Sequence, residues 1–74
     1  MSQKINLRVK VEPGSIVRVL VAMGKRGYEP AALTATKKDD VFDLTVVVED
    51  DRPLTQLTRA LERQFDVDSV EVVK

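Results

Sequence analysis

The residues best placed to hold a ligand form a short loop, Glu12-Pro13-Gly14-Ser15, between a strand pattern and a helix pattern. The first backbone N–H groups of a helix have no intrahelical acceptor, and together with the helix dipole they favour a bound anion. This loop can therefore receive the carboxylate end of a small ligand. The plainer alternative is that Gly14 makes the turn and Ser15 caps the helix.

Two acidic clusters, Asp39-Asp40 and Glu49-Asp50-Asp51, offer neighbouring carboxylates for acid–base chemistry. The chain contains no histidine and no cysteine, so neither cluster has an imidazole or a thiol beside it. The same composition excludes disulfides and Cys/His zinc sites. Aspartate is common in turns and at helix starts, and we expect that role for both clusters. The sequence thus predicts no catalytic residue and no metal site.

Composition narrows the partners of the chain. Its 74 residues make one domain, 1–74, near the size at which a single core is barely sufficient. Twelve basic and twelve acidic residues balance, so we expect neither nucleic acid nor a membrane surface as a partner. The start has no apolar run typical of a signal peptide, which indicates a cytoplasmic protein.

Hydrophobic periodicity predicts six elements. Alternation indicates strands, and apolar residues three or four apart indicate helices. The expected elements are a strand over 5–11, a helix from 15 to about 26, strands over 29–37 and 42–48, a helix over 54–65, and a strand around 70–72. In the second helix, the apolar stripe extends from Leu54 to Phe65. In the last strand, Val70 and Val72 are expected to point inward.

These elements predict an α+β fold of the ferredoxin-like βαββαβ type. Two helices with one apolar stripe each cover one face of a four-stranded antiparallel sheet of order 4-1-3-2. The open face carries Asn6, Arg8, Asp43, Thr45 and Val47, which offer no aromatic platform for RNA bases. We expect Arg8 to pair with Asp43 across the strands rather than to bind an anion.

The order and spacing of several short motifs resemble an ACT domain, the amino-acid-sensing module of biosynthetic enzymes. The segment from Glu12 to Leu20 is followed by Lys25-Arg26-Gly27-Tyr28-Glu29 and Leu33. The resemblance is strongest to the small regulatory subunit of acetolactate synthase. In that family a Gly-x-Leu-x-Arg-Val helix start leads to an Arg-Gly-Tyr or Arg-Gly-Phe helix end. The short, single-domain form is similar to the isozyme II type.

The resemblance implies an effector site at the loop. It maps onto Val11, Glu12, Pro13, Gly14, Ser15, Ile16 and Glu29. Valine-sensing members have asparagines where this chain has Val11 and Glu29. An asparagine amide both donates to a ligand carboxylate and accepts from its ammonium group, whereas valine does neither. The resemblance therefore implies weak or absent valine sensitivity.

The resemblance also implies partners. The chain would bind and activate the catalytic large subunit of acetolactate synthase, which holds thiamine diphosphate, magnesium and FAD; no cofactor is expected in this chain. Tyr28 and Val47 are candidate contacts with that subunit. A homodimer is expected through the weakly charged edge strand Ala31, Ala32, Leu33, Thr34, Ala35 and Thr36. Alternatively, Pro30 and the neighbouring lysines protect this edge in a monomer.

Two further functions stay open at this point. The first is a free-standing ACT module that binds an amino acid and regulates another enzyme or a signalling protein. The second is a small ferredoxin-like enzyme such as an acylphosphatase. That enzyme needs a phosphate-binding loop with an arginine, and Glu12 puts an acid at that place. The sequence therefore favours a regulatory module over an enzyme.

Overall fold

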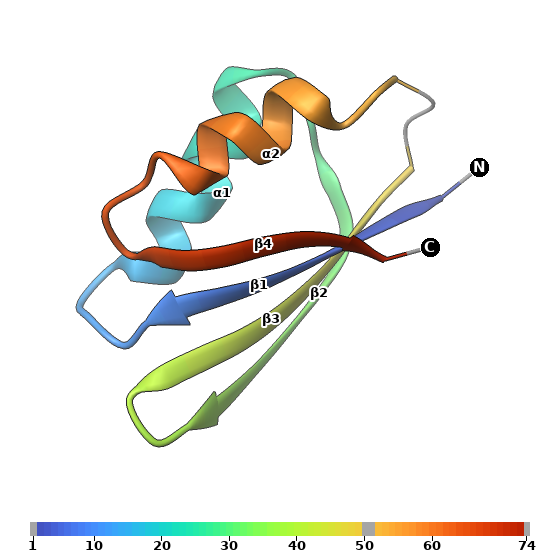
Figure 1. Ribbon diagram of the computed structural model, residues 1–74. Helices are drawn as coiled ribbons and strands as arrows, with labels where there is room; N and C mark the ends of the chain where they lie inside the picture. Colours follow the sequence, from blue (N-terminus) through green and yellow to red (C-terminus); the bar gives the residue numbers. More distant parts are fainter. Residues whose placement is uncertain (1, 50–51, 74) are drawn as a thin grey trace.

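The computed structural model of the chain describes residues 2–49 and 52–73. Its elements within those ranges are β1 (Gln3–Lys10), α1 (Ser15–Lys25), β2 (Pro30–Lys38), β3 (Val41–Val48), α2 (Thr55–Glu62) and β4 (Val67–Val73). Both helices lie on the same side of the sheet (Figure 1). The predicted βαββαβ order and two-layer arrangement are confirmed. No helix in the described ranges is long and apolar enough to cross a membrane.

The four strands pair antiparallel in the order β2-β3-β1-β4, which is the predicted order read from the other edge. β2 and β4 are therefore the edge strands. Lys4 of β1 lies opposite Val73 of β4, so the start of β1 and the end of β4 lie at the same end of the sheet (Figure 1). The β2–β3 turn lies at the opposite end of the strands.

The core fills the space between the sheet and the helices. Alternate residues of β1 and β3 point toward the helices, as the period-two pattern predicts, and the stripes of α1 and α2 meet them. The fully buried apolar side chains are Ile5, Leu7, Val9, Val19, Met23, Leu44, Val46, Val48, Leu57 and Leu61. β2 contributes no buried residue, because it lies at the edge away from α2.

The second helix is shorter than predicted. It ends at Glu62, and a turn follows in which the Val67 N–H donates to the Gln64 carbonyl at 3.1 Å. Phe65 lies in this turn with 79% of its surface exposed, so its place in the core stripe was wrong. The Lys10 ammonium stands 4.9 Å from the Phe65 ring centroid. The turn reverses the chain before a further helical turn could bring Phe65 inward.

The last strand keeps its predicted inward-facing residues, but their burial decreases along the strand. Val67 is buried and Val70 is half-buried against the core. Val72 lies opposite the buried Ile5 of β1 and therefore on the core face, as predicted, but it is 37% exposed. α2 packs against β4, but this short helix does not extend over the far end of an edge strand.

Tyr28 is buried and not a surface contact as predicted. Its side chain is 6% exposed, and its hydroxyl donates to the Pro53 carbonyl at 2.9 Å. The Arg52 guanidinium lies 4.1 Å from the ring centroid and donates to the Gly27 carbonyl at 2.8 Å. We call this contact of Tyr28 with Arg52 and Pro53 the Tyr28 clasp. It joins the end of α1 to the segment before α2.

Candidate functional site

The start of α1 depends on a left-handed glycine. Gly14 has φ 76° and ψ 8°, a conformation that costs other residues free energy because their Cβ meets the backbone. A Cβ at this position would also come within 3.4 Å of the Arg18 guanidinium. The Ser15 N–H donates to the Glu12 carbonyl at 3.1 Å, which closes the loop. Glycine is therefore favoured here mainly by the left-handed conformation, since the nearby Arg18 side chain can move to make room for a Cβ.

Ser15 does not cap the helix, contrary to the prediction. Gly14 occupies the N-cap position, and no side chain bonds to the first amides. Ser15 is instead the first helical residue, 1% exposed, and its hydroxyl has no hydrogen-bond partner among the described residues. The backbone N–H groups of Ile16 and Val17 likewise have no backbone acceptor in residues 2–49 and 52–73. Several donors are thus left at one helix start.

A shallow depression of 180 Å³ opens beside these donors. Its lining residues are Glu12, Gly14, Ser15, Ile16, Val17 and Phe42. Pockets that enclose a small molecule are usually about 300 Å³ or larger. A single copy of the chain therefore offers a partial site for an amino acid, with donors on one side and apolar residues on the other.

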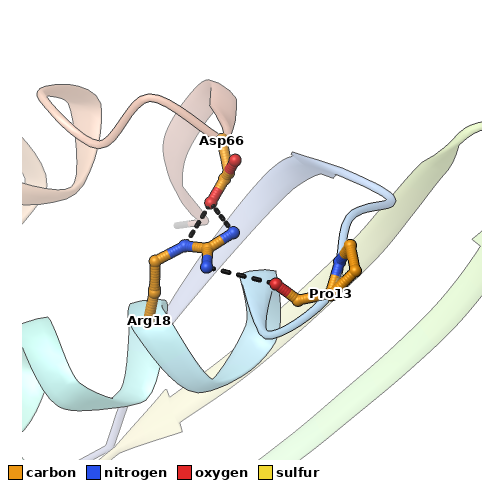
Figure 2. A network of polar contacts seen from close by, with 3 residues as sticks. All are labelled: Pro13, Arg18 and Asp66. Atoms are coloured by element: carbon orange, nitrogen blue, oxygen red, sulfur yellow. Dashed lines mark hydrogen bonds and ion pairs between the residues drawn. The ribbon is translucent and has the colours of Figure 1, made fainter.

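Arg18 fixes the loop to the turn before β4 (Figure 2). Its guanidinium pairs with the Asp66 carboxylate through both Nε and Nη2, and its Nη1 donates to the Pro13 carbonyl at 3.1 Å. The Lys10 N–H donates to the Asp66 carbonyl at 2.7 Å, which holds the same turn against β1. We call this contact of Arg18 with Pro13 and Asp66 the Arg18 clamp. Nothing in the local pattern around Arg18 indicated a partner 48 residues away.

Two carboxyl groups meet at the clamp. The pKa of Glu12 is raised, chiefly because its carboxyl shares a hydrogen bond with Asp66, and burial and the like charge add to this. Burial by itself would raise the pKa of Asp66, but the hydrogen bonds from Glu12 and Arg18 lower it overall. Glu12 therefore takes up a proton before Asp66 does. Above both pKa values, this negative charge opposes an anion at the helix start.

The structure brings together only part of the predicted effector site. Glu12, Gly14, Ser15 and Ile16 line the depression, whereas Val11 and Pro13 do not. The Val11 N–H donates to the Asp40 carbonyl at 3.1 Å. Glu29 lies beyond the other end of α1, in a depression of 390 Å³ lined also by Leu20, Gly24, Gly27, Tyr28 and Pro30. An 11-residue helix separates the two places by about 16 Å.

Only the first acidic cluster is fully described, and it forms a turn. Asp39 and Asp40 form the β2–β3 turn, with Asp39 at φ 55°. Glu49 is exposed at the end of β3, and Asp50 and Asp51 lie outside the described residues, so their predicted capping role is not seen. Leu54, directly before α2, occupies the N-cap position, and its side chain makes no capping hydrogen bond. No group of three possible metal ligands occurs in the described ranges.

The open face of the sheet shows the predicted register but a different bond. Arg8 lies opposite Asp43, as expected. The Asp43 carboxylate accepts from the Asn6 amide at 2.9 Å, and within the described residues no ion pair joins it to Arg8. A depression of 500 Å³ lies here, lined by residues of both charge signs from β1, the β2–β3 turn and β4. This mixed lining does not converge on one kind of ligand.

The fold is similar to several solved structures. The ACT domain from GTP pyrophosphokinase of Chlorobium tepidum superposes with a TM-score of 0.82 at 17% identity, over 100% of this chain and 86% of that one. The ligand-free regulatory subunit of aspartate kinase from Thermus thermophilus gives 0.79 at 18% identity, over 99% and 50%. The C-terminal domain of the MgtC protein from Mycobacterium tuberculosis gives 0.68 at 14%, over 97% and 84%.

The sequence supports the same relation. Comparison with curated proteins gives no significant match. Residues 11–70, however, match the ACT domain family, and they include the loop, both helices, β2, β3 and most of β4. ACT domains are regulatory modules that bind amino acids. The chain belongs to the ACT domain family.

Proposed function

We propose that this ACT domain is the small, non-catalytic subunit of an acetolactate synthase of the isozyme II type. It binds the catalytic large subunit of branched-chain amino acid biosynthesis and activates it, with weak or no sensitivity to valine. Thiamine diphosphate, magnesium and FAD belong to the catalytic partner in this proposal. Activation is then a coupling free energy between the two subunits.

The weak effector site is the observation that carries this proposal. Glu12 lines the 180 Å³ depression at the start of α1, so an acidic residue borders the place where a ligand carboxylate would bind. Val11, at a position where valine-sensing relatives have an asparagine, does not line the depression. A valine molecule would therefore meet a negative charge, and it would lack the hydrogen bonds that an asparagine at position 11 could make. Both features favour weak or absent valine sensitivity, which is the part of the proposal that the site itself supports.

A homodimer through β2 is part of the proposal. This strand lies at the sheet edge, and its residues from Ala31 to Thr36 are exposed or half-buried without a charge among them. A two-fold axis that pairs two β2 strands antiparallel reverses every element of the second copy. The C-terminal end of α1 in one copy then lies on the same side as the N-terminal end of α1 in the other. This arrangement brings Glu29 toward the loop of the partner copy.

The second candidate is a free-standing amino-acid sensor. The unpartnered Ser15 hydroxyl favours it, because buried polar groups normally have a hydrogen-bond partner, and the amides of Ile16 and Val17 at the same helix start add further donors. A ligand carboxylate would supply that acceptor. In this case an amino acid binds the isolated domain, and the regulated protein is a different one.

One experiment separates the two candidates. Acetolactate formation from pyruvate is measured with a purified catalytic subunit from the same genome, with and without this chain, and with and without valine. Stimulation that valine does not reverse is the expected result. Sedimentation of the chain alone in the same buffer tests the dimer, and valine, leucine and isoleucine are titrated into it by calorimetry.

The outcomes are distinct. No stimulation, together with saturable amino-acid binding that Gly14→Val abolishes, would contradict the proposal and favour the sensor. Stimulation that valine reverses would contradict only the predicted insensitivity. Thr34→Lys, which places a charge on the proposed dimer edge, is a control. It should abolish the dimer in the sedimentation experiment and leave the fold of the domain unchanged.

A further inference from the structure

The outer side of the helix layer carries two adjoining depressions between α1 and α2. The first has a volume of 220 Å³ and is lined by Arg26, Gln56, Arg59, Ala60 and Arg63. The second has a volume of 340 Å³ and is lined by Arg18, Val21, Ala22, Lys25, Arg26 and Gln64. Arg26 belongs to both, so we treat them together as the interhelical groove.

The interhelical groove is strongly basic although the whole chain is neutral. No acidic residue lines either depression. Arg18 is neutralised by Asp66 in the Arg18 clamp. The other four cations, Lys25, Arg26, Arg59 and Arg63, have no side-chain hydrogen bond or ion pair within the described residues. The interhelical groove therefore presents four unpaired cations to its surroundings, with no acidic residue among the described residues that line it.

Local stability explains only part of this arrangement. Lys25 and Arg26 suit the negative end of the α1 dipole, and Arg63 suits that of α2. Arg59 and Arg63, however, are four residues apart on one helix face, where like charges repel. Glu62, one residue from Arg63, lines neither depression. An anionic partner would relieve the repulsion that the isolated domain leaves in place.

The floor of the groove indicates what kind of anion fits. Ala22 and Ala60 are buried at 5% and 6% exposure, and Val21 is half-exposed beside them. Small side chains let another backbone approach closely, and the Gln56 and Gln64 amides line the groove beside the cations. A bare phosphate would use the arginines but not this apolar floor. An amphipathic segment with carboxylates on its flanks would use both.

We propose that the interhelical groove is a docking site for an acidic amphipathic segment of the protein that this domain regulates. Arg26, Arg59 and Arg63 pair with its carboxylates, and its apolar residues lie on Ala22, Ala60 and Val21. The inference rests on the proposed function only for the identity of the partner. It assigns the binding surface to the helix layer and leaves the β2 edge for the homodimer.

The test uses a synthetic helix-forming peptide with glutamates on one face and leucines on the other, labelled for fluorescence anisotropy. The wild-type chain should bind it saturably, and added salt should weaken the binding. The double variant Arg59→Glu and Arg63→Glu should bind about tenfold more weakly or worse, since charge reversal replaces attraction by repulsion. The matched control, Lys37→Glu and Lys38→Glu, changes the net charge equally on β2 and should bind like the wild type. Circular dichroism checks that both variants fold.

Several results would overturn the inference. They are no saturable binding by the wild-type chain, an equal loss in the two variants, or equal binding of a peptide with lysine for every glutamate. Tighter binding of single-stranded RNA or inorganic pyrophosphate than of the peptide would also overturn it. So would self-association of the chain that only the Arg59/Arg63 variant loses, because the occupant would then be a second copy.

The acetolactate assay keeps the two proposals apart. If the chain binds the peptide but does not stimulate acetolactate synthase, the docking site in the groove is supported and acetolactate synthase is rejected as the partner. If the wild type and the Arg59/Arg63 variant stimulate the enzyme equally, the docking site is rejected and acetolactate synthase is retained as the partner.

Discussion

Two junctions hold the helices to the rest of the domain, and they use different chemistry. The Arg18 clamp joins the start of α1 to the turn before β4 through charged groups, and Arg18 itself is half-exposed. The Tyr28 clasp joins the end of α1 to the segment before α2 through a buried aromatic ring. One junction lies at each end of α1.

The difference between the junctions suggests a division of roles. A buried ring contributes mainly through apolar burial, which changes little with pH. The Arg18–Asp66 ion pair, with Arg18 half-exposed and Asp66 buried, responds to protonation and, on its exposed side, to salt. The unpartnered donors of Ser15, Ile16 and Val17 lie at the clamp end. We infer that the clasp supports stability, while the clamp shapes a loop that can respond to a ligand.

The largest expected effect comes from the clasp. Tyr28→Ala removes a buried ring and should lower the free energy of unfolding by about 3 kcal/mol or more, as for other aromatic truncations. Tyr28→Phe keeps the ring and loses the bond to Pro53, so it should cost only about 1 kcal/mol. Urea unfolding followed by circular dichroism measures both. Equal losses for the two variants would show that the hydroxyl, and not the ring, carries the clasp.

Smaller changes in the free energy of unfolding are expected for alanine substitutions at two glycines, one at each end of α1. The two changes should have opposite signs. Gly14→Ala forces a Cβ into the left-handed region and should destabilise by about 1 kcal/mol. Gly24→Ala, in the last turn of α1, where the added Cβ meets no atom of another element within 4 Å, should stabilise by up to about 1 kcal/mol. Gly14→Asn, which tolerates the left-handed region better, should lose less than Gly14→Ala. The same urea titration decides, and a gain at Gly14→Ala would contradict the left-handed start of α1.

The smallest expected effect is the pH dependence of the clamp. The lowered pKa of Asp66 stabilises the fold above the ordinary aspartate pKa, and this contribution is lost as pH falls through the folded value. The raised pKa of Glu12 stabilises the fold below the ordinary glutamate pKa, and this contribution is lost as pH rises through the folded value. The two contributions oppose each other, so the urea midpoint should change little across acidic pH.

The individual titrations are more informative than the stability. Carbon-detected NMR should give Glu12 a pKa above its ordinary value in the wild type. Asp66→Asn removes the neighbouring carboxyl, and the pKa of Glu12 should then fall toward that ordinary value. An unchanged Glu12 pKa in the variant would show that the two carboxyls do not interact.

Most of the fold could be predicted from the sequence, because it depends on the hydrophobic periodicity of each element and on the glycines and prolines that end the elements. The alternation from Ile5 to Val9 and the helical stripe of α1 indicated which side chains are buried. Gly27 marked the end of α1 and has φ 77°. The errors lie where distant contacts decide. Tyr28 is covered by Pro53, 25 residues later, and the turn after Glu62 leaves Phe65 outside the core.

Only part of the candidate site could be predicted, because the rest also depends on contacts between residues far apart in the sequence. A glycine in the loop indicated the helix start, and the structure confirms that Gly14 is left-handed. The buried Ser15 hydroxyl and the Arg18–Asp66 pair could not be found from local patterns, since each depends on how the layers pack. The separation of Glu29 from the loop follows from the length of α1. The pattern of motifs alone did not show that separation.

The pairing of Lys4 with Val73 has a consequence for engineering. Because β1 and β4 are neighbours, a short linker can join the start of β1 to the end of β4, and new ends can be opened at the exposed Asp39-Asp40 turn at the far end of the sheet. Such a circular permutant would keep every strand pair. For the same reason, the domain can be inserted into a surface loop of another protein through two adjacent attachment points, with α1 and its loop left uncovered.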